Sequence, residues 1–383
     1  MQPNILICTV GTSLFRPNLE TLKRERQEGK IRPELVGLAE AYEKQDWAAV
    51  ARELGTLPPS DRTCGAEINS IASMIERGYV PANCGLFFLH SDTPDGKSIG
   101  VVLRQYFQAR GHAPVETICV PDLQDQDPKR FRTKGLRNLA RYLCRIIRQY
   151  SPATCAINAT GGYKAQIAIA VVLGQAIGVP VYYKHELFSE IIAFPALPVA
   201  LDLEVWMRAS GMLFDLERSP EPIPAKTYED EWDEKYESLV ERVSIDNVDY
   251  LELSPTGQIF HETFRHRFQL IQDRLTPPAV APEQKQKPRL EKAGWRGEHP
   301  EVQRFLERVT AEVPQVIRCE TFYYNPDLPQ RTRFRLSSKG IEGIYSDGTF
   351  TVKFAVRSSA RTRSEEAAVV ALLNDWLHRQ YLS

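Results

Sequence analysis

A glycine-rich turn between a predicted strand and a predicted helix is the most informative feature of the sequence. The run TCAINATGGYKAQI covers residues 154–167 and contains Thr160, Gly161 and Gly162 directly before the helix, with Lys164 beside them. Glycine lets a backbone approach a ligand closely, and the first N–H groups of a helix attract anions. The turn therefore predicts a phosphate-binding site. The alternative is a packing turn that binds nothing, because many parallel sheets contain one.

Two further loops follow predicted strands and are rich in the same residue types. TVGTS covers residues 9–13 after the first strand, and HSDTPDGKS covers residues 90–98 after the second. Because the carboxyl ends of parallel strands meet at one edge of a sheet, the three loops should lie together and offer backbone and hydroxyl donors to phosphates. The GKS triplet does not indicate a nucleotide triphosphatase, since the glycine required five residues before Gly96 is replaced by Ser91.

Predicted strands and helices alternate over the first two hundred residues, which is typical of an α/β fold with a doubly wound parallel sheet. Buried strands are expected at 5–8, 85–89, 115–120, 154–158 and 179–183, with helices at 99–109, 135–149 and 163–177. A helical insertion at 33–77 follows the first strand, and the sequence does not indicate its role.

Composition indicates a multidomain protein of the cytoplasm without a membrane anchor. The chain has 383 residues, of which 43% are apolar and 25% charged, and no apolar run is long enough to span a bilayer. Its seven cysteines are scattered and never form a CxxC pair, which favours reduced thiols in a protein core over disulfides or a metal site. No cofactor is predicted.

The first domain is expected to end at residue 200, and three segments follow it. Residues 201–275 contain a short strand and a helix that should begin at Ser254, which predicts a small winged-helix-like unit. Residues 276–289 are polar and proline-rich, which predicts a linker. Residues 290–383 should form a small α+β domain in which a basic antiparallel sheet lies between two helices.

The loop TVGTS and the run NATGGYKAQ resemble the ligand loops of the CRISPR-associated Rossmann-fold (CARF) family, and the segment containing SPTG resembles the winged-helix unit that often follows them. The resemblance covers about residues 1–275. It implies a homodimer that binds a cyclic oligoadenylate made by a type III CRISPR complex, namely cyclic tetra-adenylate or, alternatively, cyclic hexa-adenylate. The four-phosphate ring and the dimer share a two-fold axis. By position, the implied ligand-binding residues are Thr9, Gly11, Thr12, Ser13, His90, Ser91, Asn158, Thr160, Gly161, Gly162 and Lys164.

The C-terminal segment combines many basic residues with few carboxylates. Nine basic and four acidic residues lie between 318 and 363, a balance that suits an RNA backbone and not a metal site. The Arg–His spacing of HEPN ribonucleases and the metal-binding pattern of restriction-type nucleases are both missing. The alternative is a solvated basic surface. On the closing helix, His378 lies opposite the apolar stripe and is expected in solvent.

The order RFRLSSKGIEGIYSDGTFTVKFAVRSSARTRSEEA is similar to that of RelE-type toxins, which are ribosome-dependent messenger RNA interferases. The similarity implies a metal-independent endoribonuclease whose arginines stabilise the charge of a pentacoordinate phosphate. Two positions differ, because a family arginine aligns with Glu342 and a family tyrosine falls on an alanine. The implied catalytic residues are Arg333, Arg335, Lys339, Arg361 and Arg363.

The main hypothesis is a cyclic-oligoadenylate-activated ribonuclease of type III CRISPR antiviral defence that cuts messenger RNA at the ribosome. One alternative is a CARF-family transcription regulator, although residues 230–275 are rich in Asp and Glu where DNA binding requires basic residues. The other alternative is a ring nuclease that binds and degrades cyclic tetra-adenylate.

Overall fold

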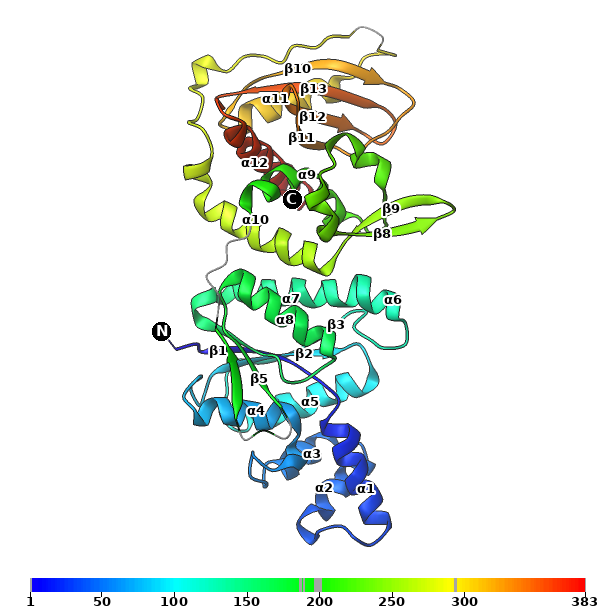
Figure 1. The fold of residues 1–383 in the computed structure, drawn as a ribbon, viewed down its shortest axis with the longest axis vertical. Helices are drawn as coiled ribbons and strands as arrows, with labels where there is room; N and C mark the ends of the chain where they lie inside the picture. The colour runs from blue at the N-terminus through cyan, green and yellow to red at the C-terminus, as the bar shows by residue number, and fades with distance from the viewer. Residues whose placement is uncertain (1, 186–187, 189, 196–201, 293–294, 383) are drawn as a thin grey trace. The chain divides into compact units, whose positions relative to one another are not determined.

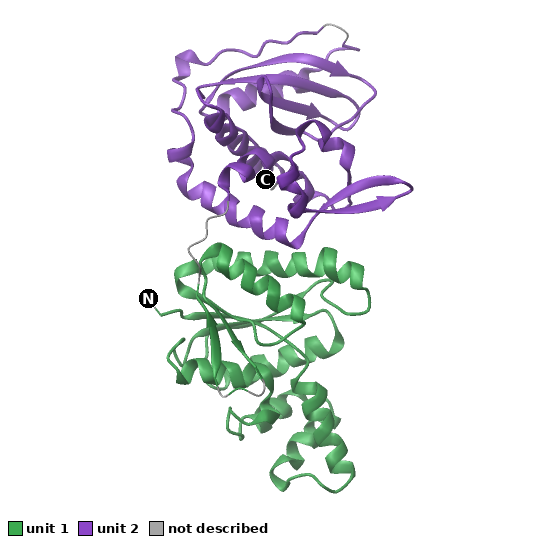
Figure 2. Cartoon of the chain, viewed as in Figure 1, with its two compact units in different colours: residues 1–200 green, residues 201–383 purple. Residues whose placement is uncertain are grey.

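The computed structural model describes residues 2–185, 188, 190–195, 202–292 and 295–382. The chain divides into two compact units, residues 1–200 and 201–383 (Figure 2). The division falls where the sequence places the end of the first domain. Residues 201–383, in contrast, form one unit although the sequence predicts two domains and a linker there.

The first unit is built around a six-stranded sheet in the order β3-β2-β1-β4-β5-β6. Neighbouring strands are parallel except that β6 runs antiparallel to β5. The strands are Ile5–Thr9 (β1), Gly85–Ser91 (β2), Val115–Val120 (β3), Cys155–Asn158 (β4), Val181–Lys184 (β5) and Ile191–Phe194 (β6). The predicted α/β fold with a largely parallel sheet is confirmed, and β6 is the strand that the sequence analysis missed.

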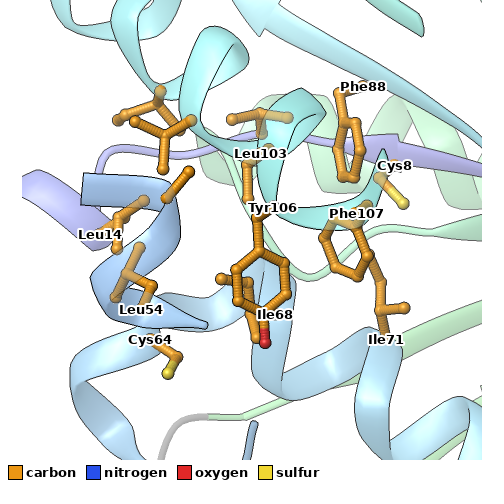
Figure 3. Close-up of a cluster of buried hydrophobic side chains, with 14 of the residues drawn as sticks. Cys8, Leu14, Leu54, Cys64, Ile68, Ile71, Phe88, Leu103, Tyr106 and Phe107 are labelled. Carbon is orange, nitrogen blue, oxygen red and sulfur yellow. The ribbon is translucent and has the colours of Figure 1, made fainter. Parts of the chain in front are cut away.

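Helices cover both faces of this sheet (Figure 1). Helices α7 (Leu136–Tyr150) and α8 (Lys164–Ile177) lie on one face, and α4 (Gly65–Glu76) and α5 (Pro94–Gln108) lie on the other. The remaining short helices are η1 (Leu14–Leu19), α1 (Glu20–Gln27), η2 (Pro33–Leu35), α2 (Val36–Glu43), α3 (Trp47–Leu54), η3 (Arg62–Cys64), α6 (Pro128–Arg130), η4 (Phe131–Gly135) and η5 (Pro152–Thr154). Leu14, Ile68, Phe88 and Leu103 show how η1, α4, β2 and α5 share one apolar core (Figure 3).

The strand order creates a switch point between β1 and β4. From β1 the chain proceeds to β2 and β3 on one side, and it then returns to β4 on the other side of β1. The connections that leave β1 and β4 therefore diverge to opposite faces, which opens a crevice beyond their carboxyl ends. The loops at 9–13 and 160–164 border this crevice.

The second unit contains a three-stranded sheet, β7-β9-β8, and a four-stranded antiparallel sheet, β10-β13-β12-β11. Its elements are α9 (Leu203–Arg218), β7 (Ile223–Pro224), η6 (Ala225–Glu231), η7 (Glu234–Leu239), β8 (Val240–Ile245), β9 (Val248–Leu253), α10 (Pro255–Leu275), η8 (Pro282–Gln284), α11 (Pro300–Glu312), β10 (Val316–Asn325), β11 (Arg333–Ser337), β12 (Gly340–Ser346), β13 (Thr351–Ser358) and α12 (Arg363–Leu382). Helix α10 begins as predicted, because the Ser254 hydroxyl accepts a hydrogen bond from the Gly257 N–H at 2.9 Å. The predicted antiparallel C-terminal sheet is confirmed.

Helix α12 packs on two sides, which joins the parts of the second unit. Ala367 and Ala371 belong to the core formed around Trp206 by α9 and α10, whereas Val369 and Leu373 belong to the core formed by the four-stranded sheet and α11. The small alanine side chains let α9 approach α12 closely. The segments 201–275 and 290–383 thus share their interior.

His378 illustrates the consequence of this packing. Its ring centroid lies 5.0 Å from that of Phe214 on α9, and the residue is only 7% exposed. Burial lowers the pKa of the imidazole to about 4. The prediction that His378 lies in solvent is therefore wrong, because the side of α12 opposite the sheet is covered by α9.

The segment predicted as a linker lies along the outer edge of β10. The Gln286 N–H donates to the Ile317 carbonyl at 2.9 Å, and the Arg289 N–H donates to the Cys319 carbonyl at 2.9 Å. These hydrogen bonds satisfy backbone groups that an edge strand would otherwise expose. The end of the predicted linker, at Gln286 and Arg289, therefore covers the open edge of β10.

Two further sequence-based expectations concern membranes and cysteines. Among the described residues, no helix has the length and apolar character needed to cross a membrane. Six of the seven cysteines are buried, as expected for residues that fill a core, and only Cys119 is partly exposed.

Candidate functional site

The loops after β1 and β4 pack directly against each other at the switch point. The Thr9 hydroxyl is buried and donates to the Gly161 carbonyl at 2.5 Å. A Cβ atom on Gly11 would lie 2.6 Å from the Gly162 nitrogen, and Gly162 itself has a φ of +102°. The glycines are therefore needed for the contact between the two loops, whereas the sequence analysis attributed them to the approach of a ligand.

Side chains in the first two turns of helix α4 form hydrogen bonds with both loops. The Gly11 N–H donates to Glu67 Oε1 at 2.7 Å, which fixes the loop after β1. The Asn158 amide donates to the Ser70 hydroxyl at 2.8 Å, which fixes the end of β4. Asn158 is buried, so its side chain positions the loop, and this placement does not support a contact with a ligand.

Glu67 is a buried carboxyl group at the centre of this arrangement. It is 1% exposed, and burial raises its pKa to about 7, although the hydrogen bond from Gly11 opposes the shift. Its Oε2 atom makes no hydrogen bond within the described part of the chain. A Cβ atom on Gly161 would lie 2.0 Å from Glu67 Oε1, so the second loop also lies against the carboxyl group. The charge beneath both loops therefore changes near neutral pH.

An open pocket lies beside the two loops, and we call it the switch-point pocket. It combines cationic side chains, an imidazole, hydroxyls and amides, a set that can bind phosphate, ribose and base edges. The polar residues that line it are Ser13, Asn18, Arg62, Asn69, Thr160, Lys184 and His185. They come from η1, η3, α4 and the ends of β4 and β5.

Two of the predicted ligand residues line this pocket. The Thr160 hydroxyl donates to Asn158 Oδ1 at 2.6 Å and accepts from the Lys184 N–H at 3.1 Å. The Ser13 hydroxyl accepts from the Ala66 N–H at 3.2 Å. These hydrogen bonds fix the two hydroxyl groups at the border of the pocket.

The other predicted ligand residues differ in exposure. Thr12 and Lys164 are exposed at the ends of their loops and are not among the residues that line the pocket. His90 and Ser91 are buried at the end of β2, where the Ser91 and Thr93 hydroxyls lie 2.8 Å apart at the start of α5. Burial lowers the pKa of His90. His90 and Ser91 thus brace α5, and their placement does not support a role in ligand contact.

The sequence analysis missed most of the pocket lining. Arg62 and Asn69 belong to the insertion at 33–77, whose role could not be inferred, and Lys184 lies at the end of β5. The sequence did contain one signal, namely Asp61 and Gly65 on either side of Arg62. In the structure, the Asp61 carboxylate accepts a hydrogen bond from the Thr63 N–H at 2.8 Å, and Gly65 has a φ of +81°. An Asp and a Gly at this spacing indicate a capped helix start, and a basic residue inside such a start is well placed for an anion.

In the second unit, Arg333 is buried in an ionic cluster. Its Nε donates to Glu231 Oε1 at 2.9 Å, its Nη2 donates to the Thr227 carbonyl at 2.8 Å, and the residue is 1% exposed. Burial raises the pKa of Asp215 and of Glu231, and the nearby Arg333 guanidinium opposes both shifts. Arg333 therefore links η6 and α9 to β11, and this placement does not support the predicted catalytic role.

Arg335 is also largely buried, between two carboxylates. Its Nη2 lies 2.7 Å from Glu342 Oε1 on the neighbouring strand and 3.2 Å from Asp230 Oδ2 on η6. Glu342 stands where the RelE resemblance has an arginine. The substitution gives Arg335 a fixed partner on its own sheet.

The remaining predicted catalytic residues lie at the other end of β11. Lys339, Arg361 and Arg363 are exposed. Arg363 donates to the Ser337 carbonyl in the turn that holds Lys339, so these residues belong to one region and Arg333 to another. Within the described ranges, no group of three or more His, Cys, Asp or Glu side chains is arranged to hold a metal ion.

One comparison with known families gives a match. Residues 62–197 match the model of a family described as CRISPR-associated protein (Cas_APE2256). The matched region runs from η3 to beyond β6 and includes Arg62, Asn69, Thr160 and Lys184 of the pocket. The chain matches no curated protein. This part of the chain is thus similar to a CRISPR-associated family, which indicates a role in CRISPR defence.

Glu67→Gln should remove a pH dependence from the stability of the first unit. The usual carboxyl pKa of 4.5 rises to about 7 in the folded state, so the folded state binds more protons than the unfolded state between these values. Stability should therefore fall as pH rises through this window, by roughly 3 kcal/mol for a shift of this size. Denaturant unfolding across the window, for wild type and variant, measures the difference.

Glu116→Gln is a matched control for this experiment, because Glu116 is exposed on β3. It should keep the pH dependence of the wild type. If Glu67→Gln has the same pH profile as the wild type, Glu67 does not titrate in this range.

Arg333→Met should lower the free energy of unfolding of the second unit by about 3–5 kcal/mol, because it leaves the buried Glu231 without its hydrogen-bonded arginine. Asp215 loses a nearby positive charge as well but keeps Arg218 at 2.6 Å. Tryptophan fluorescence reports on this unit, since four of the five tryptophans lie in it. Arg361→Ala, at an exposed position, should change the stability by less than about 0.5 kcal/mol. Equal stability of the two variants would show that the ionic cluster is dispensable.

Proposed function

We propose that the chain is a CRISPR-associated sensor whose first unit binds a cyclic oligoadenylate and whose second unit then cuts RNA. The observation that carries this proposal is the switch-point pocket. It places Arg62 and Lys184 beside the hydroxyls of Ser13 and Thr160, at the edge of the sheet where α/β folds bind ligands. The pocket also lies largely within the region that matches a CRISPR-associated family.

The chemistry of the pocket suits an adenylate ring. Guanidinium and ammonium groups bind phosphate oxygens, and hydroxyls serve phosphate or ribose. The Asn18 amide donates to the Arg62 carbonyl at 2.8 Å, and the Asn69 amide donates to the Pro59 and Asp61 carbonyls at 2.7 and 2.8 Å. These bonds fix the two amides, whose oxygens could accept from the amino group of an adenine. In a homodimer, two copies of the pocket would be related by the same two-fold symmetry as a cyclic tetra-adenylate.

The second unit would supply a metal-independent ribonuclease. In such a reaction the 2′-oxygen of the RNA gives up its proton and attacks the adjacent phosphorus. The bond to the 5′-oxygen then breaks, and this oxygen takes up a proton. Exposed Lys339 and Arg361 would stabilise the charge of the pentacoordinate phosphate. Arg363 could join them only by releasing Glu366, which its guanidinium contacts at 2.8 Å. On the ribosome, the substrate would be the messenger RNA.

A transcription regulator is less well supported by the contacts in 230–275. Arg242 lies 2.9 Å from Glu237, and Arg265 lies 3.6 Å both from Glu217 and from Asp375. A DNA-binding helix needs basic side chains that are free to contact phosphates. Arg242 and Arg265 instead pair with carboxylates of their own unit.

Arg62→Ala should weaken the binding of cyclic tetra-adenylate about 10–100-fold, because a hydrogen bond to a charged group contributes about 1.5–3 kcal/mol. Isothermal titration calorimetry gives both the affinity and the expected ratio of one ring per dimer. Lys44→Ala removes an exposed positive charge at the end of α2 and serves as the control. Unchanged affinity of Arg62→Ala, or no binding by the wild type, would contradict the proposed sensor site.

The double substitution Lys339→Ala and Arg361→Ala should abolish activator-dependent cleavage of transcripts in a translation extract. Loss of two cations near the reacting phosphate should cost at least about 100-fold in rate. Lys287→Ala, exposed on the segment along β10, should keep full activity. Full activity of the double variant would assign the chemistry to other residues.

A further inference from the structure

The C-terminal sheet has one apolar face and one polar face. Phe334, Val352 and Phe354 belong to the core with α11 and α12. Side chains alternate along a strand, so Arg335 and Lys353 point to the opposite face. We call this opposite side the polar face. The strand register places Lys353 directly beside Tyr323 of β10.

One end of the polar face is covered by η6. Glu231 reaches Arg333 and is itself only 9% exposed at its side chain, so it belongs to the interior. Asp230, the preceding residue, has a side chain that is 68% exposed, yet its carboxylate lies on the polar face. The two neighbouring acids thus have different surroundings, and only Glu231 is needed to fill the core.

Asp230 places one carboxylate oxygen between two cations. Its Oδ2 accepts hydrogen bonds from Nη1 and Nη2 of Arg335, each at 3.2 Å, and lies 4.0 Å from the Lys353 ammonium. Glu342 holds the other side of the Arg335 guanidinium at 2.7 Å, which fixes its orientation. A guanidinium fork binds a phosphate oxygen in the same way as a carboxylate oxygen.

An aromatic ring stands next to this charged group. The Lys353 ammonium lies 5.3 Å from the centroid of the Tyr323 ring, and Tyr323 is 39% exposed. Exposed aromatic rings beside cations are the platform on which single-stranded nucleic acids stack their bases. Arg335, Lys353 and Tyr323 together therefore have the parts of a nucleotide subsite.

We propose that Arg335 and Lys353 form a phosphate subsite for single-stranded RNA on the polar face, and that Asp230 occupies it in this structure. The proposal deepens the proposed ribonuclease function and rests on it. Asp230 would then act as a built-in competitor of RNA. The Asp230 side chain is 68% exposed and lies 4.0 Å from the Lys353 ammonium, so a polyanion can displace its carboxylate.

Asp230→Asn should raise the affinity of the full-length protein for single-stranded RNA about 3–10-fold in the absence of activator, because the competing charge is gone. The probe is a fluorescein-labelled RNA of about ten nucleotides, a length that such sites accommodate. Fluorescence anisotropy measures the binding, and Asp230→Ala must give the same gain.

Glu229→Gln removes the same charge from the adjacent exposed residue and is the matched control. It should leave the affinity at the wild-type value. Adding Lys353→Gln to Asp230→Asn should cancel the gain, because it removes half of the phosphate subsite.

The proposal is overturned if Asp230→Asn does not bind RNA more tightly than the wild type, or if Glu229→Gln gains as much. It is also overturned if the gain survives Lys353→Gln. Failure of the ribonuclease proposal appears separately, as absence of activator-dependent transcript cleavage by the wild type. The RNA-binding comparison among the variants needs neither activator nor ribosome, so the two outcomes are distinguishable.

Discussion

The hydrogen bond from the Gly11 N–H to the buried carboxyl of Glu67 is the contact on which the first unit depends. It joins the loop after β1 to α4, and the same carboxyl lies against Gly161 in the loop after β4. A side chain on either glycine would push the loops apart. Helix α4 of the insertion therefore fixes the two loops that border the crevice at the switch point.

This arrangement explains why fixed polar side chains border the pocket although the core beneath it is apolar. Ser70 and Glu67 are the polar positions of α4 that face the sheet, and their neighbour Ile68 joins the apolar core. Buried polar groups stabilise a structure only when they are hydrogen-bonded, so each of them fixes its partner loop in one position. A ligand that enters the pocket meets hydroxyls and amides that are already oriented.

The sequence predicted most elements but not which side chains face outward. Apolar runs located five of the six strands of the first sheet, because buried parallel strands are apolar throughout. Because side chains alternate along a strand, Arg333 and Arg335 lie on one face of β11. This alternation could not reveal that η6 covers this face, since that contact joins residues about a hundred positions apart. The burial of His378 escaped prediction for the same reason, because α9 reaches α12 from far along the chain.

Both units place a carboxyl group beside a site suited to an anion, but the two groups differ in burial. Glu67 is enclosed, so it reduces its charge by taking up a proton, and the structure around it need not move. Asp230 is exposed, so it stays in contact with Arg335 and Lys353 only as long as no stronger anion competes. A phosphodiester brings several oxygens and a stacking base to the same cations, whereas the carboxylate brings one oxygen. Weakness of the Asp230 contact is therefore the property that, in the proposed ribonuclease, would let the polar face exchange an internal carboxylate for RNA.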